Sequence, residues 1–181
     1  MPFGPIIAVT MVSSAAEVRR IRPTEWEGLR DLRLRALVES PTAFGGVFEQ
    51  EEQSPDEHWR ERAGKFATDP AEILFVVAGQ DGVLRGMTRG VLSSGPSDAA
   101  HLFGMYVGPA FRGQGYGRRL VEEVCEWARR AGEHRIILDV TETNLPAIRL
   151  YEACGFARTG RTQPLPHTPA LQEIEMECAL G

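Results

Sequence analysis

The chain has 181 residues, of which 43% are hydrophobic and 25% charged, and its formal net charge is −5. This length suits one domain with a single sizeable core, and the composition is ordinary for a soluble globular protein. The negative charge argues against a broad nucleic-acid-binding surface, and no stretch approaches the roughly 20 apolar residues of a membrane span. Neither nucleic acid nor membrane is therefore expected as a partner.

The first 14 residues contain one short apolar run and no basic segment, so they do not have the pattern of a signal peptide. We expect residues 1–14 to form a loose or disordered extension and residues 15–181 to form a single domain. Cys125, Cys154 and Cys178 are odd in number, far apart in sequence and not in a CxxC pair. This usage predicts reduced thiols in a cytoplasmic protein, without a disulfide framework or a bound metal.

The first part of the chain predicts helices and strands separated by turn signals. In chain order, we expect a strand at 17–22, helices at 24–40 and 55–66, and strands at 72–79, 82–94 and 99–107. The Asp81-Gly82 turn predicts that the strands on either side of it form an antiparallel hairpin.

The second part predicts a strand–helix–strand unit. In chain order, we expect a helix at 115–131, a strand at 135–140, a helix at 144–156, a loop at 161–171 that contains His167, and a last strand at 171–180. The apolar run RIILDV is typical of a buried parallel strand. Because one helix joins 101–107 to 135–140, these two strands should be parallel neighbours with a right-handed crossover. The expected fold class is α/β, with one mixed central sheet flanked by helices.

The stretch AFRGQGYGRR places Gly113, Gly115 and Gly117 directly before an amphipathic helix, with Arg112 and Arg118 on either side. Glycine is a poor helix former, and the helix dipole disfavours cations in the first turn. A bound polyanion would resolve both conflicts, because glycines allow close approach and the first N–H groups of a helix point at an anion. The alternative is a flexible turn with solvated arginines. The spacing of the glycines does not match the dinucleotide-binding fingerprint or the P-loop motif. The only remaining support for an enzyme that acts on a nucleotide phosphate is therefore the presence of the glycines.

The spacing R-x-x-G-x-G, formed by Arg112, Gly115 and Gly117 between a strand and a helix, resembles the pyrophosphate-binding motif of the GCN5-related N-acetyltransferase (GNAT) superfamily. The segments LFGMYVGPAFRGQGYGRRLVEEV and LDVTETNLPAIRLYEACGF carry the resemblance, with RALVESPTAFGGVFEQEE as a looser match. In element order it covers residues 17–180. It implies direct transfer of the acetyl group of acetyl-CoA to an amine of a small molecule or peptide, without a metal or a covalent enzyme intermediate. The alternative is a non-catalytic acyl-CoA-binding sensor.

In this family the parallel strands 4 and 5 splay apart, and the pantetheine arm of acetyl-CoA enters the gap; the matching strands are 101–107 and 135–140. The resemblance implies that Asn144 hydrogen-bonds the arm, although Asn144 could equally be only a helix cap, and that Ala147 leaves room for it. The other expected cofactor contacts are the backbone of Met105, Tyr106 and Val107, and for the pyrophosphate Arg112, Gly113, Gln114, Gly115, Tyr116, Gly117 and Arg118.

The resemblance also implies two catalytic groups. Tyr151 matches the tyrosine beside the thioester sulfur, where a phenol with a pKa near 10 could protonate the departing thiolate; otherwise it is a buried aromatic. His101 is the only histidine on the central strand, and a pKa near 6.5 suits a general base. It could instead be structural, with a water relay through Asp98 or Glu72 taking the proton.

The acceptor side is the least determined part of the sequence. Phe44, Glu49 and Glu52, with Glu51 between the two acidic residues, could line it and attract a cationic amine, but such a charge run is often only a solvated face. The alternating strand at 171–180 could lie at or near a sheet edge that needs covering, which predicts a homodimer.

Overall fold

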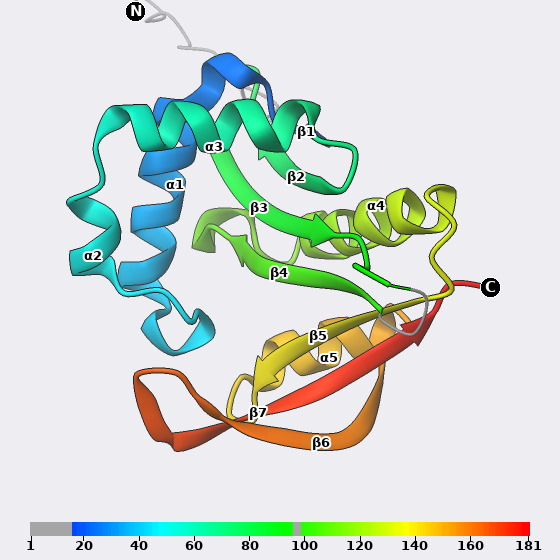
Figure 1. The fold of residues 1–181 in the computed structure, drawn as a ribbon. Helices are drawn as coiled ribbons and strands as arrows, with labels where there is room; N and C mark the ends of the chain where they lie inside the picture. Colours follow the sequence, from blue (N-terminus) through cyan, green and yellow to red (C-terminus); the bar gives the residue numbers. More distant parts are fainter. Residues whose placement is uncertain (1–15, 96–98) are drawn as a thin grey trace, which may run out of the picture.

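The computed structural model describes residues 16–95 and 99–181, so the expected extension at 1–14 and the candidate relay residue Asp98 lie outside it. The described residues form one seven-stranded sheet in the order β1-β2-β3-β4-β5-β7-β6, with helices on both faces (Figure 1). The strands are β1 (Glu17–Arg20), β2 (Glu72–Ala78), β3 (Leu84–Val91), β4 (Ala100–Val107), β5 (Arg135–Thr141), β6 (Ala157–Leu165) and β7 (Thr168–Ala179). The helices are α1 (Trp26–Glu39), α2 (Phe48–Glu52), α3 (Asp56–Thr68), α4 (Tyr116–Arg130) and α5 (Leu145–Ala153).

The strand pairing confirms the expected mixed α/β fold. β2 and β3 form the antiparallel hairpin, and Gly82 in their turn has a φ of 78°. β4 and β5 are parallel neighbours joined through α4, as the strand–helix–strand pattern predicts. The other pairs of neighbouring strands are antiparallel.

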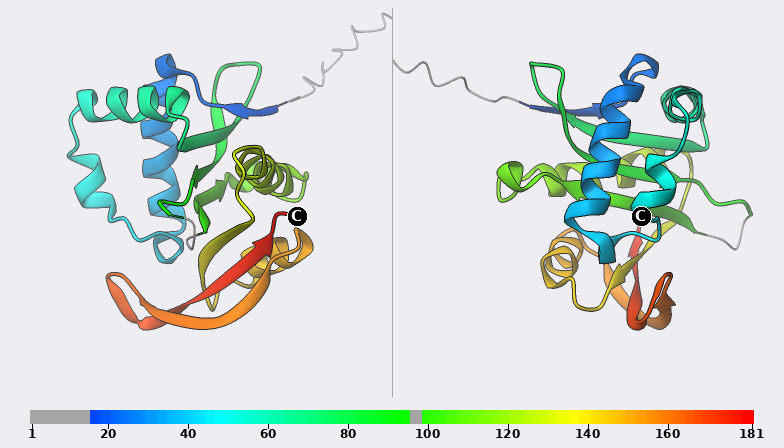
Figure 2. Two further views of the ribbon diagram at one scale, coloured as in Figure 1. Left: turned by 45° about the vertical axis from the view of Figure 1, so that its right-hand side comes forward. Right: turned by 90° about the vertical axis from the view of Figure 1, so that its left-hand side faces the viewer.

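Two apolar cores cover the two faces of the sheet. On one face, α4 buries Leu120, Val121, Val124 and Ala128 completely, at the helical spacing read from the sequence. On the other face, α1 and α3 pack against β2 and β3 through a second cluster that includes Leu32 and Trp59. Figure 2 shows α1 and α3 on the side of the sheet away from α4. The strands between them are thus held from both sides.

β4 and β5 separate shortly after they begin. Their pairing is limited to Ala100 with Ile136 and His101 with Ile137, and the two strands then diverge (Figure 1). Just beyond this point β4 contains a bulge, because Gly104 and Met105 together face Thr88 of β3. Gly104 has a φ of 62°, a conformation that favours glycine. The limited pairing of β4 with β5 confirms the splay expected from the family resemblance, and a bulge of this kind bends its strand.

One expectation about the C-terminal region needs correction and another is made more specific. The segment 161–171 is not a loop, because it belongs to a hairpin in which β6 and β7 are joined at Pro166 and His167, and His167 has a φ of 65°. β7 lies near the sheet edge, as expected, but is not itself the edge strand: it pairs with β5 on one side and with β6 on the other. The edge strand is β6, and only Leu165 among its residues is buried. The polar connection before α3 contains the short helix α2, which the sequence did not indicate.

The three cysteines, far apart in sequence, lie around one hollow. Cys125 from α4, Cys154 at the end of α5 and Cys178 from β7 line it, and all three are free thiols. Burial raises the pKa of each thiol, to about 12 for Cys125, so they are protonated and poorly nucleophilic. Within the described ranges, no cluster of three or more His, Cys, Asp or Glu side chains could hold a metal ion.

Candidate active site

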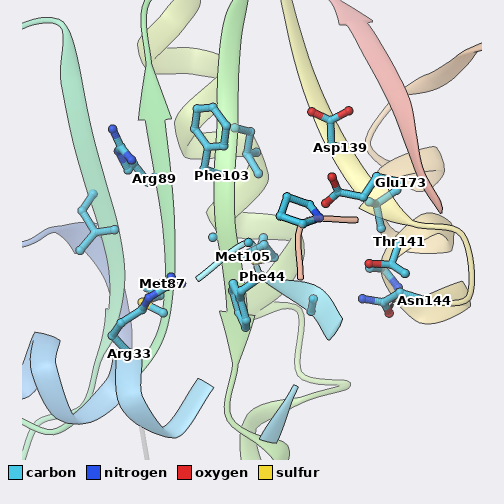
Figure 3. A pocket seen from close by; sticks show the side chains of 18 of the residues that line it. Arg33, Phe44, Met87, Arg89, Phe103, Met105, Asp139, Thr141, Asn144 and Glu173 are labelled. Carbon is cyan, nitrogen blue, oxygen red and sulfur yellow. Dashed lines mark hydrogen bonds between the residues drawn. The ribbon is translucent and has the colours of Figure 1, made fainter. Parts of the chain in front are cut away.

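A cavity of about 360 Å³ lies where β4 and β5 diverge (Figure 3). Its size is within the range of small-ligand sites, roughly 300–1,000 Å³. The splayed strands and α5 contribute Leu102, Phe103, Gly104, Met105, Asp139, Val140, Thr141, Asn144, Ala147 and Tyr151. The lining contributed by the rest of the chain includes Arg33, Phe44, Arg62, Met87, Arg89, Gln163 and Glu173.

The glycine loop ends at the N-terminus of α4. Gly113 and Gly115 have φ values of 72° and 84°, and Gly115 is the residue that caps α4. No atom lies within 4 Å of a Cβ built at either position, so backbone conformation rather than space requires glycine there. Gly117 differs, since a Cβ there would lie 3.1 Å from Cδ2 of Leu150 in α5. The loop thus presents the first backbone N–H groups of a 15-residue helix, which lack acceptors within the helix.

The polar side chains of the loop make contacts that the sequence did not predict. Nε of Arg112 donates to the carbonyl of Val107 at 2.8 Å, which ties the loop to the end of β4. Nε2 of Gln114 donates to the carbonyl of Ala110 at 2.8 Å. Arg118 pairs with Glu122 one turn along the helix at 2.8 Å, and this contact raises the pKa of Arg118. Arg112 and Arg118 are both exposed and carry further N–H groups that could meet a polyanion.

Two of the tyrosines among the expected cofactor contacts point into the core. The Tyr106 hydroxyl donates to Glu39 at 2.7 Å, and burial together with this hydrogen bond raises the pKa of Tyr106 to about 12. The Tyr116 hydroxyl accepts from the backbone N–H of Ala16 at 3.4 Å. Only the backbone of these two residues can therefore meet a cofactor. Met105, which belongs to the bulge, lines the cavity with its side chain (Figure 3).

Helix α5 contributes three of the expected residues to one cavity. Asn144 caps the helix, as predicted, and its Oδ1 accepts from the N–H of Ala147 at 3.4 Å. Tyr151 is only 5% exposed and packs against Phe156 with ring centroids 5.9 Å apart, and burial raises the pKa of its phenol. Within the part of the chain that the structure describes, the Tyr151 hydroxyl makes no hydrogen bond, and it is not one of the fully buried polar atoms that lack a partner. The ring of Tyr151 packs in the apolar core, and Tyr151 also lines the cavity.

His101 lies outside this cavity. It lines a neighbouring hollow of about 730 Å³, stacks on Phe103 with ring centroids 5.2 Å apart, and places Nδ1 3.3 Å from the carbonyl oxygen of Ala99. Glu72, the other relay candidate, is buried and forms ion pairs with Lys65 and Arg89. The structure therefore does not bring His101 and Tyr151 into one cavity.

Of the residues considered for the acceptor side, some line the cavity and others do not. Phe44 lines the cavity and is only 6% exposed. Glu49 and Glu52 are exposed on α2 and are not part of the cavity lining. Glu51 is half-buried and pairs with Arg33 at 2.7 Å and with Arg62 at 3.3 Å.

Charged residues that the sequence analysis did not select also line the cavity. Arg33, Arg62 and Arg89 come from α1, α3 and β3, and Asp139 and Glu173 come from β5 and β7. Two signals could have indicated them. Asp139 interrupts the apolar run RIILDV, and Arg33 follows the core residue Leu32 at an apolar position of the helical pattern. A charge in such a position often faces a site rather than the core.

Splayed parallel strands, a glycine loop at the N-terminus of α4 and a buried tyrosine in the cavity between the strands are the arrangement expected of an acyl-CoA-dependent acyltransferase. Residues 26–156 match the acetyltransferase (GNAT) family, and the chain belongs to that family. It is therefore an N-acetyltransferase that uses acetyl-CoA, as the sequence resemblance implies. No helix in the described ranges is long and apolar enough to cross a membrane.

Three relatives illustrate how far the similarity extends. An aminoglycoside N(6')-acetyltransferase type 1 from Serratia marcescens is 32% identical over 114 residues, or 60% of this chain and 77% of that protein. A streptothricin acetyltransferase from Streptomyces lavendulae is 37% identical over 97 residues, and the match spans 54% of this chain but only 51% of the relative. The structure of a GCN5-related N-acetyltransferase from Kribbella flavida superposes with a TM-score of 0.72 at 26% identity, covering 91% of this chain and 98% of that one.

Proposed function

We propose that this chain transfers the acetyl group of acetyl-CoA directly to the primary amine of a small molecule or peptide bound in the cavity between β4 and β5. The observation that carries the proposal is Tyr151, a buried residue of that cavity whose hydroxyl has no hydrogen-bond partner in the described part of the chain. A phenol in this environment is available to a ligand that enters the gap.

The cofactor would be held by backbone groups at both of its ends. Beyond His101 and Ile137 no pairing joins β4 to β5, which leaves backbone groups of Met105 and Val107 able to pair with an amide-containing arm. The N–H groups from Gly113 to Gly117, with the guanidiniums of Arg112 and Arg118, would bind the pyrophosphate. The Asn144 side chain would meet the arm while still capping α5.

In the transfer step, the neutral amine nitrogen attacks the thioester carbonyl carbon, so that a C–N bond forms and the C–S bond breaks. The electron pair of the C–S bond goes to sulfur, which takes a proton from the Tyr151 hydroxyl. The amine nitrogen loses one proton to a base before the attack and a second one as the amide forms, and one of these two protons returns to the Tyr151 phenolate. Overall, an ammonium and acetyl-CoA become an amide, CoA thiol and one proton. The raised pKa of Tyr151 keeps the phenol protonated until the thiolate forms.

The route for the amine proton would run through Asp139. This carboxylate lines the cavity, and its pKa is raised by burial and by Glu175, while His101 opposes that rise. The pKa of Asp139 in the cavity therefore depends on His101 in the neighbouring hollow. His101 can serve as the final base if Asp139 or a water molecule carries the proton to it.

The test is CoA thiol release from acetyl-CoA across a panel of amines, with product mass confirming one added acetyl group. Turnover of at least one amine is expected. The competing function is a sensor that binds acyl-CoA without chemistry, and tight acetyl-CoA binding with no turnover on any amine would support it instead.

We also propose that the protein is a cytoplasmic homodimer. The free cysteines support a reducing compartment, and the largely exposed edge strand β6 supports association with a second copy. Sedimentation should give twice the 20.0 kDa chain mass at micromolar concentration, and a species of single-chain mass alone would contradict the dimer.

A further inference from the structure

The cavity has walls of opposite charge. Figure 3 shows Arg33 and Arg89 on the side of α1 and β3, and Asp139 and Glu173 on the side of β5 and β7. Arg62, from α3, also lines the cavity. Phe44, Phe103 and Met105 lie between the two walls as an apolar surface (Figure 3).

The arginine wall has more cations than carboxylates. Arg33 and Arg62 share the single carboxylate of Glu51, at 2.7 and 3.3 Å. Burial lowers the pKa of Arg62; Glu51 opposes this shift, and the nearby charges of Arg33 and Arg89 lower the pKa further, so each of these two guanidiniums repels that of Arg62.

Arg89 is also incompletely satisfied. Its Nε lies 2.5 Å from a carboxylate oxygen of Glu72, but this buried nitrogen makes no hydrogen bond, because the contact is poorly aligned. Glu72 is shared with Lys65, so its one negative charge also serves two cations. An anionic ligand group would relieve the excess positive charge on this wall.

The opposite wall has the reverse imbalance. Asp139 stands beside Glu175 in the pairing of β5 with β7, and Thr141 stands beside Glu173. Asp139 makes no ion pair within the described residues, and burial together with Glu175 raises its pKa. Glu173 accepts one hydrogen bond, from Gln163 at 3.3 Å, and burial raises its pKa too. A cation bound here would be stabilised by both carboxylates.

We propose that the acceptor is a small amino acid, a molecule with one ammonium and one carboxylate group, whose ammonium is bound by Asp139 and Glu173 and whose carboxylate is bound by the arginine wall. This inference rests on the proposed function. A polycation would place a positive charge against three guanidiniums, whereas a zwitterion matches both walls. The cavity must also hold the acetyl end of the cofactor, and its volume of about 360 Å³ suits a small acceptor.

The first experiment compares matched acceptors on the unmodified protein at saturating acetyl-CoA. The two sets are L-methionine with L-methioninamide, and 6-aminohexanoate with 6-aminohexanamide and 1,6-diaminohexane. In at least one set, kcat/KM for the amino acid should exceed that for its amide by tenfold or more, and the diamine should be poorest. Equal or better use of the amides or the diamine, or of an aminoglycoside such as kanamycin, would overturn the inference while leaving the proposed acetyltransferase intact. No turnover on any amine would defeat the proposed function, and the inference with it.

The second experiment locates the carboxylate-binding group. Arg89→Gln should lower kcat/KM for the preferred amino acid at least tenfold, mainly through KM, and should change that for its amide by less than twofold. Arg89→Lys, which keeps the charge, should recover part of the loss. Arg60→Gln is the matched control, because Arg60 lies over the Trp26 ring, outside the cavity lining. Equal losses for amino acid and amide in Arg89→Gln would show a structural role only and would contradict the assignment.

Discussion

Replacing Tyr151 by phenylalanine tests the proposed chemistry with little structural disturbance. The substitution keeps the ring, which is 5% exposed and packs on Phe156, and removes a hydroxyl that has no hydrogen-bond partner in the described residues. Stability should therefore change by less than about 1 kcal/mol, since no hydrogen bond is lost. A general acid contributes about 10²–10⁴-fold, so kcat should fall by that factor, which corresponds to about 2.7–5.4 kcal/mol of transition-state stabilisation.

The assay is thiol release at saturating acetyl-CoA and acceptor, with acetyl-CoA affinity measured by calorimetry and stability by urea unfolding. Tyr106→Phe provides the contrast in stability, because it removes the hydrogen bond that the buried Tyr106 hydroxyl donates to the charged, exposed carboxylate of Glu39. It should cost about 1–3 kcal/mol, unlike Tyr151→Phe. Normal turnover by Tyr151→Phe would refute the general-acid role and leave the tyrosine as core packing. A thiolate would then have to leave with the help of water or a backbone N–H group.

Three further predictions follow from the loop and from the titratable groups. Gly115→Val forces a β-branched residue to a φ of 84°, and Arg112→Ala removes a charged hydrogen-bond donor. Each substitution should weaken acetyl-CoA binding, measured by calorimetry, about tenfold or more. Unchanged affinity in both variants would exclude the loop as the pyrophosphate site. Because the pKa of Asp139 is raised, the KM for the acceptor should increase as the pH falls, and this increase should begin at a higher pH than for an ordinary aspartate with a pKa near 3.9. The Asp139→Asn variant should lose this pH dependence and should be no less stable than the unmodified protein at pH 7. A pH dependence that survives in Asp139→Asn would belong to another group. His101→Ala should shift the pH–rate profile upward, with activity partly restored where the amine is already neutral; an unshifted profile would exclude His101 as the base.

The sequence predicted best what is local in the chain. The glycine loop and the cap of α5 each depend on a few consecutive residues, so the conformations of Gly113, Gly115 and Asn144 could be inferred without knowing the fold. The parallel pairing of β4 and β5 followed from one helix joining two strands. For these features, short-range geometry is sufficient.

The features that were missed depend on contacts between distant segments. β6 reads ARTGRTQPL, and because all but its last residue are exposed it has no apolar alternation to detect. The charged walls combine residues from five elements, and nothing along the chain reports that Arg33 and Asp139 line the same space. The cysteines show the same limit: Cys125 and Cys178 are 53 positions apart, yet both line one hollow.

His101 shows why a position on a strand does not define a role. The sequence placed it correctly on the central strand, but the side of the strand, and hence the cavity that it faces, depends on where the bulge at Gly104 interrupts the alternation. His101 stacks on Phe103, which lines both hollows, whereas Met105 belongs to the bulge and lines only the cavity between β4 and β5. A one-residue insertion changes which side chains meet.

The early separation of β4 and β5 also has a thermodynamic consequence. A cofactor arm that pairs with the free backbone groups of both strands would replace the missing rungs of the ladder, and the native state alone offers this arrangement. By linkage, acetyl-CoA at a hundredfold excess over its Kd would stabilise the folded chain by about 2.7 kcal/mol, or roughly 5–10 °C in Tm for a domain of this size. Because of the gap between β4 and β5, the Tm of the protein should therefore rise with the concentration of acetyl-CoA in the solution.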